Sequence, residues 1–124
     1  STGSKTMQGA TKGQLETAIR NAIVRFEQEF MGRGPEDVRA SIVRDMVVIR
    51  LKGVLTPAER QLAKTSEGIE MVRRLRQALI AQGRERLCAQ ISNIMGAKAT
   101  ALFTDIDTQA GERVIVFSFD RDVE

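Results

Sequence analysis

Apolar positions near the start of the chain repeat with the period of an α-helix. Between Thr11 and Gly32 they are spaced three and four apart, which places them on one helix face. They are Leu15, Ile19, Ala22, Ile23, Phe26 and Phe30. Thr11 and Gln14 have the spacing of a capping box, and Gly32 followed by Gly34-Pro35 is typical of a helix end. The pattern therefore predicts a helix that begins after Thr11 and ends at Gly32.

The pattern then changes to the alternation of β-strands. Apolar and polar residues alternate over 38–43 and over 47–52, with a turn-like Arg44-Asp45 between them. The same alternation returns over 99–104 and 114–119, on either side of a turn-like segment at 108–111. These patterns predict two antiparallel hairpins. The second hairpin has one apolar side made by Ile115, Phe117 and Phe119, and its other side is also fairly apolar.

Two helices are predicted between the hairpins. Thr56-Pro57-Ala58-Glu59 combines an N-cap, a proline at the first helical position and a capping-box glutamate, which predicts a short helix to about Lys64. A longer helix follows, with Ser66 as its candidate cap and Gly96 as its end. Its expected core stripe consists of Ile69, Val72, Leu75, Leu79, Leu87, Ile91 and Ile94.

The longer helix has two further features. Gly83 falls on its stripe, where it would allow a close helix crossing or a slight bend. A helix of about 30 residues is about 45 Å long, whereas a chain of this length has a radius of gyration of about 14 Å. We therefore expect this helix to bend or to extend beyond the domain into a partner subunit.

Together these elements predict an α+β fold with a tandem αββ-αββ arrangement. The sheet is expected to have four antiparallel strands with the helices packed on one face. Strands that are apolar on both sides suggest that the second face is also covered, by another subunit.

The composition is that of a globular protein. Of 124 residues, 42% are hydrophobic and 28% charged, and this length supports one domain. We expect residues 11–124 to form a single α+β domain and the small, polar residues 1–10 to be a disordered tail or a cloning remnant. The chain has no histidine and one cysteine. These counts exclude Cys/His zinc sites, an intrachain disulfide and catalytic triads that need an imidazole.

The sequence also favours a location outside the bilayer. No apolar run approaches the length that spans a membrane, and the first residues do not read as a secretory signal. Cys88 lies within a helical apolar pattern, where a packed, reduced thiol is expected. We therefore predict a cytoplasmic protein that reaches a membrane only through a partner, without direct insertion.

One group of carboxylates is a candidate cation site. Asp105, Asp107 and Glu112 surround the predicted turn of the second hairpin and could offer oxygen ligands to a hard cation. Solvated hairpin charges that pair with Arg113 are the simpler interpretation. We therefore predict no metal site and no cofactor.

Arginines crowd the longer predicted helix. They are Arg73, Arg74, Arg76, Arg84 and Arg86. Arginine makes bidentate contacts with phosphate oxygens, so such a face could bind nucleic acid. Single-strand binding usually needs aromatic platforms, however, and the chain has five Phe and neither Trp nor Tyr. A solvated helix face with ion pairs is the preferred interpretation, and a nucleic-acid surface is the alternative.

Cationic residues accompany glycines at two points. Arg33 lies between two glycines, and Arg50 and Lys52 precede Gly53. Exposed amides at such glycines, with these three cations, could converge on an anion. Neither run is a phosphate loop, because the required Gly-x-x-x-x-Gly-Lys-Ser/Thr pattern is absent. A helix end and a polar strand face also explain them.

Three runs, taken in order, carry a resemblance to a known family. They are Phe30-Met31-Gly32-Arg33-Gly34-Pro35, Arg50-Leu51-Lys52-Gly53-Val54-Leu55-Thr56-Pro57-Ala58-Glu59 and Gly111-Glu112-Arg113-Val114-Ile115-Val116-Phe117. The chain resembles the MpsC-like family, first catalogued as a domain of unknown function and later labelled a component of a Na+-translocating, membrane-potential-generating system. The resemblance covers nearly everything from Thr11 to Glu124. It implies association with membrane proteins that move ions, in a setting linked to inorganic-carbon uptake, and it supplies no catalytic residues.

These observations lead to one main functional expectation. We expect a non-enzymatic, soluble accessory or interaction protein of a membrane ion or bicarbonate transport system, in the form of a homodimer. Arg33, Arg50 and Lys52 lie in the matching runs and have no capping role, so we predict that they form a contact surface for transport-protein subunits. The alternatives are a nucleic-acid-binding regulator that uses the arginine-rich helix and a small anion-binding domain.

Overall fold

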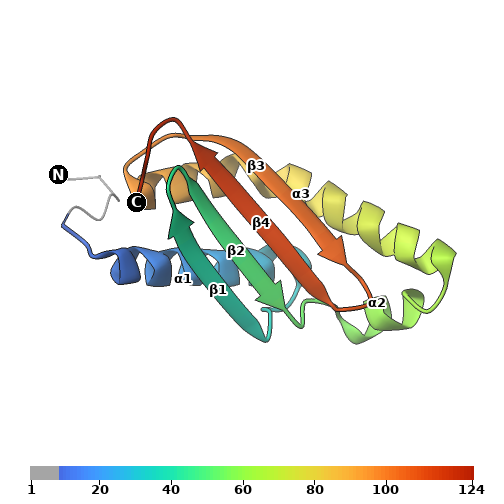
Figure 1. Ribbon diagram of the computed structural model, residues 1–124. Helices are drawn as coiled ribbons and strands as arrows, with labels where there is room; N and C mark the ends of the chain where they lie inside the picture. Colours follow the sequence, from blue (N-terminus) through green and yellow to red (C-terminus); the bar gives the residue numbers. More distant parts are fainter. Residues whose placement is uncertain (1–8) are drawn as a thin grey trace.

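The computed structural model describes residues 9–124, so most of the predicted tail at 1–10 lies outside the described residues. Three helices and four strands follow one another in the order α-β-β-α-α-β-β (Figure 1). They are α1 (Lys12–Met31), β1 (Asp37–Val43), β2 (Met46–Lys52), α2 (Pro57–Leu62), α3 (Ser66–Met95), β3 (Ala99–Asp107) and β4 (Glu112–Phe119). This order confirms the predicted tandem arrangement, with the short α2 inserted before the second unit.

The four strands form one antiparallel sheet in the order β1-β2-β4-β3. Each hairpin contributes one edge strand and one central strand, and the central pair β2 and β4 places Ile49 opposite Ile115. The helices α1 and α3 run side by side behind the sheet, on the same face (Figure 1). The predicted α+β class and the four-stranded sheet with helices on one side are therefore confirmed.

Local capping explains where α1 and α2 begin. The Thr11 hydroxyl accepts a hydrogen bond from the Gln14 amide at 3.1 Å, and the Gln14 side chain accepts one from the Thr11 amide at 2.9 Å. Gly32 ends α1 with a left-handed φ of 86°, which glycine adopts without a Cβ penalty. Thr56 and Glu59 form the equivalent capping box on α2. Both predicted starts are confirmed.

The start and the core stripe of α3 differ from the prediction. Thr65, rather than Ser66, is the N-cap, and its hydroxyl accepts a hydrogen bond from the Gly68 amide at 3.0 Å. On the stripe, Leu75 is 49% exposed while the adjacent Arg76 is 1% exposed. The predicted stripe is therefore wrong at this turn, because Arg76 finds acidic partners from two other helices inside the protein.

The crossing of α1 and α3 depends on Gly83. A Cβ at this position would lie 2.5 Å from Cε1 of Phe26 and 2.9 Å from Cζ of Phe30, closer than carbon atoms approach. The predicted close helix crossing at Gly83 is confirmed. At the other end, the first turns of α3 extend beyond the strands, and α2 packs against them (Figure 1).

The core lies between the helices and the inner face of the sheet. Its central members are fully buried aliphatic side chains from both helices and both hairpins, each worth about 1.5–3 kcal/mol relative to an exposed state. They include Ile19, Ile23, Ile49, Leu51, Leu87, Ile91 and Ile115. The opposite face of the sheet takes no part in this core.

Candidate interaction surface

The outward face of the sheet carries no covering helix or loop among the described residues. We call it the open face, and it consists of alternate residues from all four strands. They are Asp37, Arg39, Ser41, Val43, Met46, Val48, Arg50, Lys52, Ala101, Phe103, Asp105, Asp107, Glu112, Val114, Val116 and Ser118. An antiparallel sheet can leave one face in water, but such a face is then usually polar.

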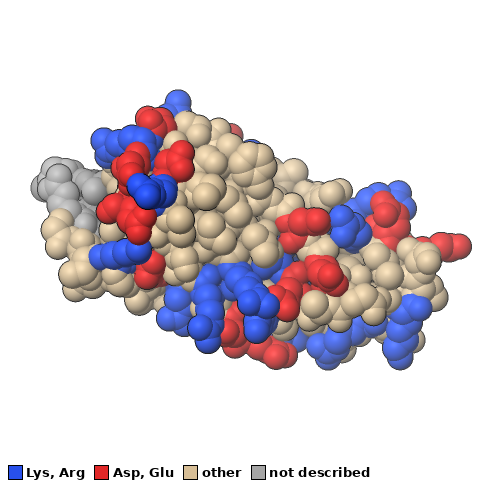
Figure 2. Space-filling view, viewed as in Figure 1, with Lys and Arg blue, Asp and Glu red and all other residues tan. Residues whose placement is uncertain are grey.

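One half of the open face is apolar. Val48 and Val116 lie opposite each other at its centre, and Phe103 pairs with Val116 from the neighbouring strand. Phe103 is 60% exposed and Val43 is 42% exposed, whereas Val114, at 41%, lies in the next row between Arg50 and Asp105. In Figure 2 this region is a continuous tan area between charged groups at both ends of the sheet. A contiguous exposed apolar patch on a folded chain indicates an interaction site.

The other half of the open face is charged. Arg50 Nε lies 2.7 Å from Glu112 Oε1, and this hydrogen bond raises the pKa of Arg50 and lowers that of Glu112. Lys52 lies opposite both Glu112 and Asp37 in the strand register. The cations of this half therefore lie on β1 and β2, and its acidic groups, apart from Asp37 at the start of β1, lie on β3 and at the start of β4.

The edge of the sheet at β1 is occupied by side chains of α1. Arg20 donates from Nε to the carbonyl oxygen of Val38 at 3.0 Å. Four residues further along the edge, the amide of Ile42 donates to the carboxylate of Glu16 at 3.0 Å. Helical side chains thus take backbone groups that would otherwise be free to pair with another strand.

The edge at β3 is occupied in the same way by α3. Arg73 donates from Nη1 to the carbonyl oxygen of Ile106 at 2.8 Å, and Arg84 donates from Nη1 to that of Leu102 at 3.1 Å. Because both edges are engaged by the protein's own helices, lateral addition of a strand would have to break these bonds. The open face is the surface of the sheet that remains available.

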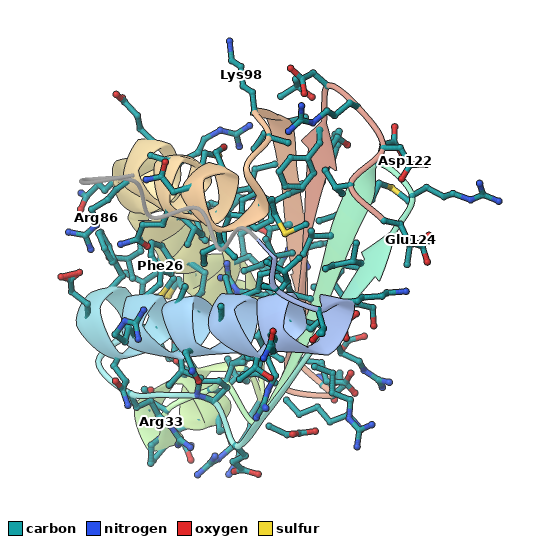
Figure 3. All side chains as sticks on the ribbon, turned by 90° about the vertical axis from the view of Figure 1, so that its left-hand side faces the viewer. Phe26, Arg33, Arg86, Lys98, Asp122 and Glu124 are labelled. Atoms are coloured by element: carbon teal, nitrogen blue, oxygen red, sulfur yellow. The ribbon has the colours of Figure 1, made fainter. Side chains whose placement is uncertain are left out.

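The three predicted contact residues lie at one end of the sheet, where β1 begins and β2 ends. Arg33 belongs to the α1–β1 loop, below α1 in Figure 3, and donates from Nη1 to the carbonyl oxygen of Leu55 at 3.3 Å. The Glu36 amide donates to the carbonyl oxygen of Lys52 at 2.8 Å, which joins the two segments. Arg50 and Lys52 are on the open face. In residues 9–124 no hydrogen bond or ion pair connects Arg33 with either of them.

The arginines of α3 are used in different ways. Arg73 and Arg84 hold the β3 edge, and Arg74 is exposed near Glu70. Arg86 pairs with Glu29 and lies 4.9 Å above the centre of the Phe30 ring, on the helical side of the molecule (Figure 3). Arg76 is buried and cannot reach a ligand at the surface. The five therefore do not form one free cationic face.

Arg76 belongs instead to a buried ionic cluster of four residues. Its other members are Glu27 of α1, Glu59 of α2 and Arg113 of β4, and all four are at most 6% exposed. Arg76 donates to both carboxylate oxygens of Glu59 at 2.8 and 2.6 Å and to the carbonyl oxygen of Val54 at 2.7 Å. Arg76 Nη1 lies 3.6 Å from Glu27 Oε1. Arg76 thereby joins all three helices, and Arg113 of β4 lies near enough for its charge to act on Glu27.

The carboxylates of the cluster differ in their proton affinity. Burial raises the pKa of Glu27, and the nearby Arg113 and Arg76 only partly offset it. Burial also acts to raise the pKa of Glu59, but hydrogen bonds from Arg76 and Thr56 outweigh it, so that pKa lies below its ordinary value. Glu27 Oε2, Arg76 Nη1 and Arg113 Nε have no hydrogen-bond partner within the described chain.

Sequence reasoning missed this cluster, although a signal was present. Glu27 follows Phe26 on the apolar face of α1, Arg76 lies one turn after Val72, and Arg113 alternates in phase with Ile115. Each is a charged residue at a position where the pattern calls for an apolar one. Such positions in three separate elements indicate a buried ionic network.

The candidate cation ligands are also placed differently from the prediction. Asp105 pairs with Arg73 at 3.0 Å and Glu112 pairs with Arg50, whereas Arg113 points into the core and contacts Thr104 at 3.4 Å. The predicted pairing with Arg113 is therefore wrong. Asp107 accepts hydrogen bonds from the amides of its own turn. In the part of the chain that the structure describes, no group of three or more Asp, Glu or Cys residues has the geometry to hold a metal ion.

A family model now explains the resemblance noted in the sequence. The model of the Na+-translocating membrane potential-generating system family (MpsC) matches residues 11–121. The chain belongs to the MpsC family. The family resemblance predicted from the three sequence runs is confirmed.

Two relatives of this MpsC-family chain come from Bacillus subtilis (strain 168), and both are named as uncharacterized proteins. YbcI is 38% identical over 114 residues, which cover 92% of each chain. YrhF is 37% identical over 106 residues, which cover 84% of this chain and 87% of YrhF. No solved structure matches this chain. Among residues 9–124, none of the helices is both long enough and apolar enough to cross a membrane.

Proposed function

We propose that this chain is a non-enzymatic accessory protein of a membrane system that moves ions such as Na+ or bicarbonate. In this proposal it acts by binding other proteins rather than by chemistry of its own. The family description supports the link to a membrane-potential-generating system. The open face supports the mode of action.

The open face is the observation that carries this proposal. Folding leaves Phe103, Val43 and Val114 between 41% and 60% exposed on one side of a sheet whose two edges are each engaged at two backbone groups by helix side chains. Burying such side chains against a protein would remove them from water, at about 25 cal/mol for each Å² of apolar area.

The contact with the membrane system is proposed to lie at the end of the sheet marked by Arg33, Arg50 and Lys52. Arg33 and Lys52 flank the junction of the α1–β1 loop with the end of β2. The α2 helix and the first turns of α3 extend beyond the strands at this same end (Figure 1). A membrane subunit with acidic groups on its exposed loops would meet cationic side chains here.

An affinity pull-down from detergent-solubilised membranes of the source organism tests this proposal. The wild-type chain is expected to retain an ion-transport subunit, identified by mass spectrometry. A variant with Arg33→Ala, Arg50→Ala and Lys52→Ala is expected to lose it. A control with Arg25→Ala, Lys98→Ala and Arg121→Ala removes the same charge from exposed positions elsewhere and is expected to keep it.

The outcomes separate the alternatives. If both triple variants retain the subunit, Arg33, Arg50 and Lys52 do not form the contact. Recovery of nucleic acid in place of a membrane protein would contradict the accessory function. In that case, binding should weaken steeply with added salt, because phosphate contacts release counterions.

A further inference from the structure

The open face needs an occupant, and its two halves restrict what the occupant can be. A partner must cover an apolar half and must also meet a charged half in which cations and anions are separated. Across the charged half, Arg39 and Arg50 come from β1 and β2, while Asp105 comes from β3. In the outermost row Lys52 lies beside Glu112 on the central pair of strands.

We infer that a second copy of this chain covers the open face, related to the first by a two-fold axis parallel to the strands. The inference deepens the proposed function by naming what binds the open face, and it rests on that proposal only in treating this face as a protein-binding surface. The product would be a two-layer sandwich of two four-stranded sheets, with the helices of both copies on the outside.

The strand register shows why this axis fits. A two-fold axis along the strands keeps the position of each residue along the strand direction and reverses the order of the strands across the sheet. As a result β1 faces β3 of the second copy, and β2 faces β4. Val48 then lies over Val116 of the second copy, and Ser41 lies over its Phe103. Apolar rows therefore meet apolar rows.

The charged rows also match under this axis. Arg39 lies over Asp105 of the second copy, and Lys52 lies over its Glu112. The side chains of Arg39 and Asp105 are 80% and 75% exposed in the single chain, where they pair with Asp37 and Arg73 and still present polar atoms to a new partner. Asp37 would lie over Asp107 at the corner of the interface, where each has a donor within its own chain: Arg39 at 3.4 Å and the amide of Gln109 at 2.9 Å.

The other in-plane axis is disfavoured. A two-fold axis across the strands would keep the order of the strands but reverse the position of each residue along the strand direction. With the two sheets fully overlapping, it would place Arg39, Arg50 and Asp105 of one copy over the row of the other that contains Val48, Val116 and Phe103. Charged groups would then be desolvated without partners, which costs several kcal/mol for each ion. Strand addition at an edge is opposed by the bonds from α1 and α3.

The first test measures the mass of the purified chain in solution by sedimentation equilibrium, over a wide range of concentration. The wild type is expected to be a dimer. Phe103→Asp is expected to weaken the dimer at least tenfold, which corresponds to about 1.4 kcal/mol. Leu75→Asp is the matched control, because Leu75 is 49% exposed on α3, away from the open face. This variant should remain a dimer.

A charge exchange tests the axis itself. Arg39→Asp and Asp105→Arg should each weaken the dimer, since each places like charges opposite one another. The double variant restores opposite charges and should recover most of the affinity. Thermal melting of each variant verifies that the fold is retained, because Asp105→Arg also removes the pair with Arg73.

Three results would overturn the inference: a monomeric wild type at high concentration, a Phe103→Asp variant that dimerises normally, or a double variant that dimerises no better than the single ones. These results are distinct from a failure of the proposed function. If the chain is monomeric but still retains the membrane subunit in the pull-down, only the dimer inference is rejected. A dimer that retains no such subunit would remove only the accessory function.

Discussion

Leu102 and Phe103 are neighbours on β3, yet Leu102 is 4% exposed beneath the helices and Phe103 is 60% exposed on the open face. The apolar side chains of the inner face are buried in the core. Four charged residues are also buried on this side, and two of them, Arg76 and Glu59, are hydrogen-bonded to each other. The open face keeps apolar side chains in contact with water. The inner face is therefore complete within one chain, and the open face is not.

The contrast extends to the charged groups. On the inner side, Arg76 and Glu59 lie in a fixed, doubly hydrogen-bonded geometry within the protein. On the open face, Arg39 and Asp105 lie mostly in solvent. Breaking a buried pair leaves an uncompensated charge, whereas an exposed pair is screened by water. Substitutions on the inner side should cost folding stability, and those on the open face should cost association.

The largest effect is expected at Arg76. Arg76→Ala leaves Glu59 buried without the cation that holds it and removes one of the two cations near Glu27, which should lower the free energy of unfolding by about 3–5 kcal/mol. Denaturant unfolding followed by circular dichroism measures it. An effect below about 1 kcal/mol would mean that the cluster is hydrated rather than buried.

The adjacent pair on β3 gives the most direct comparison of the two faces. Leu102→Ala removes buried methyl groups and should cost about 2–4 kcal/mol. Phe103→Ala, measured at concentrations where the chain is monomeric, should cost less than about 1 kcal/mol. If both substitutions cost the same in the monomer, the open face is covered by the chain itself and the comparison fails.

A smaller effect is expected in the pH dependence contributed by Glu27. Burial raises the pKa of Glu27, so the folded state holds this proton more tightly than the unfolded state does. Stability from this group should fall as pH rises from the ordinary glutamate pKa to the raised one, by at most about 1.4 kcal/mol per pH unit.

Glu27→Gln removes this pH dependence of the unfolding free energy, because the amide does not titrate. The unfolding free energy of the wild type minus that of Glu27→Gln, measured over the acidic to neutral range, should become smaller as pH increases. A difference that is constant with pH would show that Glu27 titrates normally. A difference of the opposite sign would show that Arg113 and Arg76 outweigh burial.

The smallest effect is expected at Thr56, which belongs to neither face. Thr56→Ala removes the hydroxyl that accepts the Glu59 amide at 3.2 Å and should cost about 1 kcal/mol, as is usual for an N-cap. Thermal unfolding measures it, and Thr56→Ser is the control that keeps the hydroxyl. Because Thr56 lies outside the open face, the association of the chain should be unchanged.

Much of this fold could be predicted from local patterns. The caps at Thr11 and Thr56, the helix end at Gly32 and the close crossing at Gly83 depend on residues near one another in sequence or on the absence of a side chain. The alternation of strand residues likewise predicts which side chains share a face. These features follow from helix and strand geometry, which the chain specifies locally.

The candidate surface was harder to predict. Arg33, Arg50 and Lys52 lie in the family-matching runs, and the structure places them at one end of the sheet without joining them. Phe103 appeared only as one apolar residue in an alternating strand. Its importance depends on the absence of a covering element among residues 9–124, which an alternating pattern cannot express.

The sequence by itself determined the elements, their order and the two-sided apolar character of the strands, because backbone geometry and hydrophobic periodicity act over a few residues. The tertiary structure alone decided that Arg76 is buried and that the α3 arginines close the β3 edge. It also decided that one sheet face remains open. These outcomes depend on which groups from distant segments meet: Glu27 and Glu59 compensate the charge of Arg76 only once three helices have packed together.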